Sequence, residues 1–178
     1  GVFGPDGRGL AAHLEGREQV ITLHTCGKGL GCEGALVCAP RPMTDFLVNR
    51  GRGFVFSTAP SPLMAAAVRA ALGICREAPE RRARLTRLVA HAAREIAQCS
   101  GIDPSGTPIQ PVIVHEDVRA VHLAQALQRR GFDVRAIRPP TVPEGTARLR
   151  IALTLNVTES DVSALVRAIG EELAGLVA

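Results

Sequence analysis

The sequence is poor in aromatic side chains: among 178 residues there is no tryptophan, no tyrosine and only 5 phenylalanines. Proteins that hold single-stranded nucleic acid commonly stack the bases on aromatic rings, so the composition argues against that function. No apolar run approaches the roughly 20 residues that a membrane-spanning helix needs. The 5 cysteines include no C-x-x-C pair. This count argues against a zinc site or a disulfide framework and favours free thiols in a reducing cytoplasm.

Lysine is nearly absent. Of the 21 basic residues, 20 are arginine and the only lysine is Lys28. The arginines are dispersed among acidic residues, and the densest group, at positions 81–87, follows Glu77 and Glu80. That pattern is typical of a solvated helix face and gives no indication of a nucleic-acid surface. The single primary amine therefore stands out in a chain that otherwise uses arginine for positive charge.

The chain is long enough for a sizeable core, with 46% hydrophobic residues. Its first sixty residues predict three short strands, at residues 20–23, 35–38 and 54–57, and a short helix at 42–50. The glycine-rich link between the first two strands is too short for a crossover helix, which predicts an antiparallel pair. Helices are expected at 63–77 and from Pro79 onward, where proline suits the first turn.

The residues after about position 100 predict a compact α+β unit. Strands are expected at 109–114, at 132–137 and over the alternating leucines and isoleucine of 149–155. Asp117 is expected to cap a helix that runs to Arg130, and Gly131 to end it. Thr158 followed by Asp161 resembles a capping box at the start of a last helix. A three-stranded sheet covered by helices follows from this pattern.

The segment Thr25-Cys26-Gly27-Lys28-Gly29-Leu30-Gly31 follows the first strand and holds the only lysine. It is not a Walker phosphate loop, because Gly29 stands where that motif needs Ser or Thr. An amine, unlike a guanidinium, can form a Schiff base with a carbonyl. Flanking glycines would let a flat cofactor approach the backbone, and the hydroxyl of Thr25 could bind a phosphate. A surface lysine in a flexible turn is the alternative.

Two further segments carry candidate binding residues. Ser57 and Thr58 are expected where a strand leads into a helix, and hydroxyls and free amides at a helix N-terminus suit an anion, although plain N-capping is the alternative. In Arg138-Pro139-Pro140-Thr141-Val142-Pro143 the prolines restrict the backbone, so that Arg138 is held for bidentate recognition of a carboxylate. A stiff connection between strands is the alternative. The run His115-Glu116-Asp117 is interpreted as a helix cap, and no metal site is predicted.

Taken in order, the Lys28 segment, Ser57-Thr58 and the stretch from Ile137 through Arg150 resemble the α-oxoamine synthase family of pyridoxal-phosphate (PLP) enzymes. The resemblance covers essentially the whole chain. It implies an α/β architecture of PLP fold type I, like aspartate aminotransferase. It also implies three segments: residues 1–62 from the large cofactor domain, 63–99 as connecting helices, and 100–178 as the small C-terminal α+β domain.

The resemblance further implies roles for individual residues. Lys28 would hold PLP as a Schiff base and act as acid and base at the substrate α-carbon, and Thr25 would bind the cofactor phosphate. Ser57 and Thr58 would reach the phosphate of the neighbouring subunit's cofactor, which requires a homodimer. Arg138 would grip the amino-acid carboxylate, and Thr141 would line the substrate site.

The Arg138 stretch is most similar to the branch of this family that serves biotin synthesis. That branch implies a decarboxylative condensation of L-alanine with a pimeloyl thioester, carried by CoA or a carrier protein. The alternatives are the glycine-using relatives, glycine C-acetyltransferase and 5-aminolevulinate synthase, or a non-catalytic interaction module. The family's Asp-x-Ala-His segment, which contacts the cofactor ring, is absent. We therefore expect the chain to correspond to the C-terminal part of such an enzyme and to be inactive alone.

Overall fold

The computed structural model describes residues 1–99 and 101–175. It divides the chain into two compact units, Gly1–Arg82 and a second that begins at Ala83, and each is described here by itself. The expected domain boundary at residue 100 falls outside the described residues, and the three-segment division stays a prediction. None of the helices in the described ranges has the length and apolarity needed to cross a membrane.

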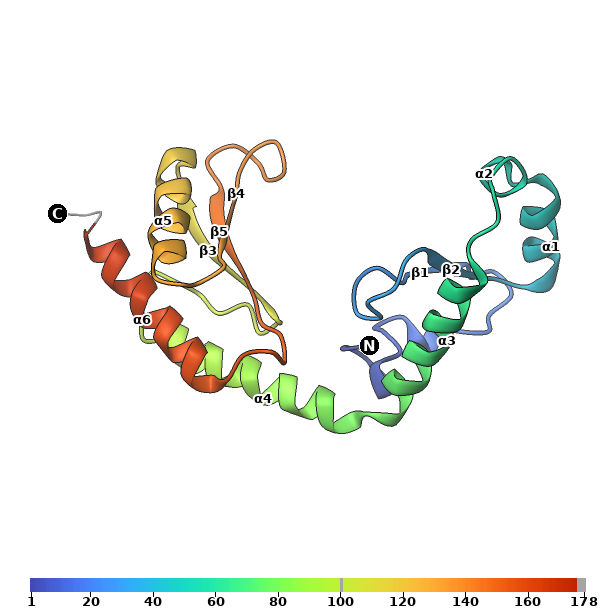
Figure 1. The fold of residues 1–178 in the computed structure, drawn as a ribbon, viewed down its shortest axis with the longest axis horizontal. Helices are drawn as coiled ribbons and strands as arrows, with labels where there is room; N and C mark the ends of the chain where they lie inside the picture. The colour runs from blue at the N-terminus through green and yellow to red at the C-terminus, as the bar shows by residue number, and fades with distance from the viewer. Residues whose placement is uncertain (100, 176–178) are drawn as a thin grey trace. The chain divides into compact units, whose positions relative to one another are not determined.

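A β-hairpin forms the centre of the first unit (Figure 1). Strand β1 (Thr22–Thr25) pairs antiparallel with β2 (Ala35–Cys38), as the short link between them predicts. Two short 3-10 helices, η1 (Pro5–Gly7) and η2 (Ala12–Leu14), precede the hairpin. The segment between the strands carries Lys28, so the hairpin determines where this lysine stands.

The prediction of a third strand in this unit, at residues 54–57, is wrong. Helix α1 (Arg41–Arg50) is followed at once by a helical turn, α2 (Arg52–Val55), which takes up part of the apolar run at 54–57. The carbonyl of Gly51 accepts hydrogen bonds from the amides of Phe54 and Val55, which closes this turn. The strand preference of Phe and Val is realised only when a neighbouring strand pairs with them, and among the described residues none pairs with this run.

Two longer helices follow. Helix α3 (Pro62–Glu77) is capped by Ser61, whose hydroxyl accepts a hydrogen bond from the amide of Leu63 at 3.3 Å. Helix α4 (Pro79–Ile96) begins at Pro79, as predicted, and its residues from Ala83 onward belong to the second unit. Leu88, Ala92 and Ile96 lie on one stripe of α4 and are buried.

The second unit is built on a three-stranded antiparallel sheet of order β3-β5-β4. Its strands are β3 (Ile109–His115), β4 (Arg135–Ile137) and β5 (Ala147–Ala152), and its other helices are α5 (Asp117–Arg129) and α6 (Glu159–Gly175). Strand β4 is shorter than expected, and β5 ends at Ala152, so Leu155 lies beyond it. Figure 1 shows α5 lying along the sheet.

One face of this sheet is buried. Along β5, Ala147, Leu149 and Ile151 are buried, whereas Arg148 and Arg150 alternate with them on the less buried face. The buried side chains of the sheet join those of α5, α6 and the later part of α4 in a single apolar core. This alternation fixes the strand register, because a slip of one residue would turn the arginines into the core.

The helix ends of the second unit match the sequence in part. Thr158 and Asp161 form the predicted capping box: the Asp161 amide donates to the Thr158 hydroxyl at 3.2 Å, and the Thr158 amide donates to the Asp161 carboxylate at 2.8 Å. The bond from the Thr158 amide, the strongest influence, and a second bond to the same carboxylate from the Thr158 hydroxyl at 2.7 Å lower the pKa of Asp161. Gly131 follows α5 with a φ of 91°, as expected of a terminating glycine. The Asp117 cap is wrong, because Asp117 is the first residue of α5 and Glu116 takes the cap position.

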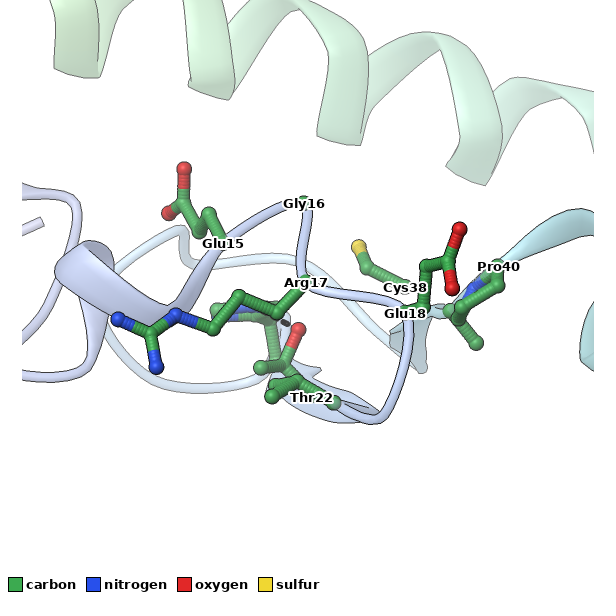
Figure 2. A pocket seen from close by; sticks show the side chains of 10 residues that line it. Glu15, Gly16, Arg17, Glu18, Thr22, Cys38 and Pro40 are labelled. Carbon is green, nitrogen blue, oxygen red and sulfur yellow. Dashed lines mark hydrogen bonds between the residues drawn. The ribbon is translucent and has the colours of Figure 1, made fainter.

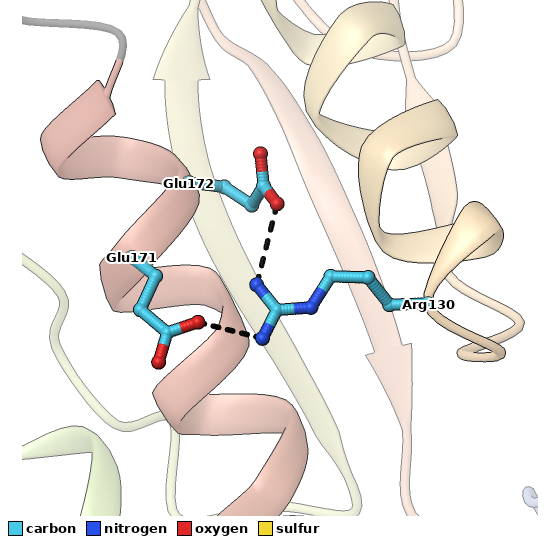
Figure 3. A network of polar contacts seen from close by, with 3 residues as sticks. All are labelled: Arg130, Glu171 and Glu172. Atoms are coloured by element: carbon cyan, nitrogen blue, oxygen red, sulfur yellow. Dashed lines mark hydrogen bonds and ion pairs between the residues drawn. The ribbon is translucent and has the colours of Figure 1, made fainter.

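An ion-pair network joins α5 to α6 (Figure 3). The guanidinium of Arg130, just after α5, donates to the carboxylates of Glu171 at 2.6 Å and of Glu172 at 3.3 Å. The hydrogen bond to Glu171, the strongest influence, raises the pKa of Arg130. These contacts hold the end of α5 against α6.

Candidate functional site

The Lys28 loop, residues 26–32, lies in the connection between β1 and β2 and is held in shape by backbone hydrogen bonds. The Cys26 amide donates to the Gly34 carbonyl at 2.9 Å and so extends the strand pairing by one residue. The Cys32 amide then donates to the Cys26 carbonyl at 2.8 Å, and a turn from Lys28 to Gly31 is closed by a 3.0 Å hydrogen bond. Gly31 has a φ of 62°, a backbone conformation that side chains other than glycine disfavour. The backbone conformation of the turn therefore explains why position 31 is a glycine.

The side chains of this loop fit a cofactor that is bound through an amine and a phosphate. Lys28 and Thr25 are both exposed, and within the described residues neither side chain has a hydrogen-bond or ion-pair partner. A methyl group built on Gly29 would meet nothing within 4 Å, so the backbone next to the lysine is open to a ligand. Thr25 and Lys28 come from the end of one strand and the loop after it, which brings the hydroxyl and the amine to the same end of the hairpin.

Ser57 and Thr58 do not stand at a helix N-terminus, and that part of the prediction is wrong. The Ser57 hydroxyl donates to the Gly53 carbonyl at 2.7 Å, which ties it to the end of α2. The N-cap of the next helix is Ser61. Within the described residues no hydrogen bond joins Ser57 or Thr58 to the Lys28 loop. Their assignment to a neighbouring subunit's cofactor phosphate stays a prediction.

Arg138 and Thr141 lie together in a turn directly after β4. The Thr141 amide donates to the Arg138 carbonyl at 3.0 Å, and the Pro139–Pro140 peptide bond is cis. Both side chains are exposed, and no ion pair engages Arg138 in the part of the chain that the structure describes. The guanidinium is thus available to an anion. Arg138 and Thr141 belong to the second unit, whereas Lys28 and Thr25 belong to the first.

His115 contributes to the frame of this turn, a role that the sequence did not reveal. The residue has a φ of 70°, and its Nδ1 lies 3.0 Å from the Gly145 carbonyl oxygen. The Thr146 hydroxyl also donates to the Pro143 carbonyl, at 2.6 Å. The sequence predicts only a helix cap for the run that begins at His115. Adjacent polar residues before a helix give no signal of a contact thirty positions away. His115 therefore joins the end of β3 to the connection between β4 and β5.

Two of the hollows on the surface of the first unit are lined in part by residues of the hairpin segment. The larger, of about 480 Å³, is lined by residues of the hairpin such as Thr22 and Cys38 and of the preceding loop such as Glu18 (Figure 2). It contains none of the predicted site residues. The smaller, of about 250 Å³, includes Gly29 and Leu30 of the Lys28 loop in its wall. In the described ranges no three His, Cys, Asp or Glu side chains gather in a way that could hold a metal ion.

The sequence matches known proteins over nearly its whole length. The family model described as aminotransferase class I and II matches residues 1–169. The 8-amino-7-oxononanoate synthase of Anaeromyxobacter dehalogenans is 44% identical over 99% of this chain and 45% of its own length. That of Chromobacterium violaceum is 43% identical over 93% of this chain and 43% of its own. The chain thus spans less than half the length of these curated relatives, and the predicted resemblance to the α-oxoamine synthases is confirmed.

Solved structures confirm the fold. The 8-amino-7-oxononanoate synthase of Francisella tularensis superposes with a TM-score of 0.85 at 23% identity, over 99% of this chain and 53% of its own. The serine palmitoyltransferase of Sphingomonas wittichii gives a TM-score of 0.86 at 23% identity, over 98% and 45%. The predicted α/β architecture of PLP fold type I is therefore correct. On the family match over residues 1–169, this chain belongs to the aminotransferase class I and II family.

Proposed function

We propose that this chain forms part of a PLP-dependent 8-amino-7-oxononanoate synthase of biotin biosynthesis, which condenses L-alanine with a pimeloyl thioester and releases carbon dioxide. The observation that carries the proposal is the position of Lys28, the only lysine, in a closed hairpin loop where its side chain is exposed and has no hydrogen-bond or ion-pair partner among the described residues. The curated relatives of that name, at 44% and 43% identity, support it. Because the chain spans less than half of their length, the activity belongs to the complete gene product.

In this proposal Lys28 provides the amine that attaches PLP, and Thr25 donates its hydroxyl to the cofactor phosphate. When bound, PLP supplies an electron sink that stabilises negative charge at the amino-acid α-carbon. The Lys28 amine removes a proton from that carbon and returns one to it, a task that an arginine could not perform because its guanidinium stays protonated. Ser57 and Thr58 bind the phosphate held by the partner subunit of a homodimer.

Arg138 binds the carboxylate of L-alanine in the proposal. A guanidinium presents parallel N–H donors that match the two carboxylate oxygens. The turn from Arg138 to Thr141 restricts the backbone beneath this side chain, so less conformational entropy is lost on binding. Thr141, beside it in the same turn, lines the substrate site. The acyl donor is a pimeloyl thioester of CoA or a carrier protein, and we place the enzyme in the cytoplasm.

The proposal is tested by replacing Lys28 in the complete gene product. We expect borohydride to fix PLP covalently to Lys28 in the wild type, as detected by mass spectrometry of the digested protein. Lys28→Arg keeps the positive charge and removes the primary amine, and Lys28→Ala removes both. Both variants should lose covalent attachment and activity. Unchanged activity in Lys28→Arg would show that charge alone matters and would favour a non-catalytic interaction module.

Substrate choice is tested separately. Wild-type gene product is supplied with pimeloyl, acetyl and succinyl thioesters, each with L-alanine or with glycine. We expect the highest kcat/KM for pimeloyl thioester with L-alanine. A preference for glycine with the acetyl donor would instead identify a glycine C-acetyltransferase, and glycine with the succinyl donor a 5-aminolevulinate synthase. Residues 1–178 alone should give no turnover with any pair, because they lack the family's Asp-x-Ala-His segment.

A further inference from the structure

Cys26 and Cys32 stand at the two ends of the Lys28 loop. The Cys32 amide donates to the Cys26 carbonyl at 2.8 Å, so the backbones of the two cysteines are in direct contact. A carbonyl oxygen and an amide nitrogen each lie within two bonds of their own Cα atom, so this hydrogen bond keeps the two Cα atoms within the roughly 7 Å that a disulfide can span. Each of the two is a free thiol.

The two cysteines differ in how far they are exposed to solvent. Cys26 is 1% exposed, which makes it one of the most buried side chains of the first unit, and Cys32 is half-buried. Between them, Gly27, Lys28 and Gly29 are exposed. The Glu33 amide donates to the thioether sulfur of Met64 on α3 at 3.2 Å, which shows that α3 lies against this end of the hairpin. Cys26 is thus shielded from solvent, and Cys32 remains partly accessible to it.

We propose that Cys26 and Cys32 are an oxidisable pair that closes the Lys28 loop into a covalent ring. With a peroxide as oxidant, the more accessible Cys32 sulfur attacks a peroxide oxygen, so that an S–O bond forms, the O–O bond breaks and hydroxide leaves. The Cys26 sulfur then attacks the Cys32 sulfur, so that the S–S bond forms and the S–O bond breaks. The two thiol protons leave in water, and two thiols and one peroxide give one disulfide and two waters.

The other cysteines are less suited to this reaction. Cys38 is exposed at the far end of the hairpin, where its register partner is Thr22. Cys75 lies on α3 and Cys99 follows α4. The inference does not depend on the proposed function. Its consequence for Lys28 is that the covalent ring restricts the motion of the loop that carries the amine.

The sequence offers a direct test, because trypsin cleaves between the two cysteines at Lys28. The complete gene product is treated with hydrogen peroxide, its remaining thiols are alkylated, and it is digested without reductant. We expect peptide 18–28 to be joined to peptide 29–50, with fragmentation assigning the bond to Cys26 and Cys32. Dithiothreitol should release the two peptides.

Two cysteine-to-serine variants show which cysteine of peptide 29–50 forms the bond. Circular dichroism first checks that each variant retains the helix content of the wild type. Cys32→Ser should abolish the joined peptides, and Cys38→Ser, which alters the other cysteine of peptide 29–50, should leave them unchanged. Joined peptides that persist in Cys32→Ser would overturn the proposal, because the bond would then involve Cys38. A wild-type chain in which Cys32 is oxidised to the sulfinic acid and Cys26 stays alkylatable would overturn it as well.

Discussion

The two units of the chain differ in how much of their apolar surface they bury. In the second unit, side chains from the sheet, α5, α6 and the later part of α4 share one continuous core. In the first unit the buried hydrophobic residues are Cys26, Val68 and Ala78, whereas Leu23, Phe56 and Leu63 are 69%, 79% and 77% exposed. Burial of apolar surface is the main favourable contribution to folding and must offset the conformational entropy of the chain. The comparison indicates that the second unit stabilises itself and the first does not.

The largest expected effect comes from separating the units. Residues 83–178, produced alone, should unfold cooperatively in urea when followed by circular dichroism, because their core is complete. Residues 1–82, produced alone, should show no cooperative transition, because three buried side chains cannot offset the entropy lost on folding. A sharp transition for residues 1–82, or a gradual one for residues 83–178, would contradict the comparison.

A smaller effect is expected from single leucines. Leu149, at the centre of β5, is fully buried, and Leu149→Ala should lower the free energy of unfolding by about 2–5 kcal/mol. Leu23, on β1 of the first unit, is largely exposed, and Leu23→Ala should change it by less than about 0.5 kcal/mol. Urea titrations of the 178-residue chain measure both. Equal losses for the two variants would show that the first unit depends on its apolar side chains as the second does.

The same contrast governs how far the fold could be predicted from the sequence. In the second unit, the alternation of apolar and polar residues around Leu149 indicates a strand, and the Thr158–Asp161 spacing indicates a helix cap. The structure contains both the strand and the cap. In the first unit the run around Phe54 carries strand-forming residues without a strand to pair with, so local preference was misleading. Such a run can be assigned only when its neighbours in space are known.

Part of the candidate site could be predicted from the sequence, because the residues concerned are close together along the chain. Lys28 and Thr25 are connected by a short loop, so their proximity follows from the sequence, as does that of Arg138 and Thr141. The contact between His115 and Gly145 joins residues thirty positions apart, and no periodicity in the sequence encodes it. The roles of Ser57 and Thr58 depend on a second subunit and stay predictions.

A pH-dependent effect is expected at the start of α6. Folding lowers the pKa of Asp161 through the hydrogen bonds from Thr158, so the ionised carboxylate stabilises the folded state. This contribution is complete above the ordinary aspartate pKa of about 3.9 and is lost as the pH falls through the lower pKa of the folded state. Asp161→Asn should therefore be less stable than wild type at pH 7, and the difference should shrink below about pH 4. Thermal unfolding followed at both pH values measures it, and a difference that does not change with pH would contradict the prediction.

The smallest effect is expected at Arg130. Its guanidinium pairs with Glu171 and Glu172 on the surface, where water and salt weaken charge interactions. Arg130→Ala should lower the unfolding temperature slightly at low salt, and the difference from wild type should shrink at high salt. Arg135→Ala is the control, because the Arg135–Asp133 pair joins neighbours on the same segment and does not connect two helices. If Arg130→Ala lowered the stability of the chain as much as Leu149→Ala does, the surface ion pairs would contribute as much as a core leucine, and the prediction would be wrong.

The connection between β4 and β5 is tied to its surroundings mainly through backbone carbonyls. His115 contacts the carbonyl of Gly145, and Thr146 donates to that of Pro143. Arg138 and Thr141, in contrast, extend from the connection without contributing to the core. Mutations at these two positions therefore carry little cost in folding, so a change there would alter binding while leaving the sheet intact. A segment of this kind can change what it binds over evolutionary time without first acquiring a new scaffold.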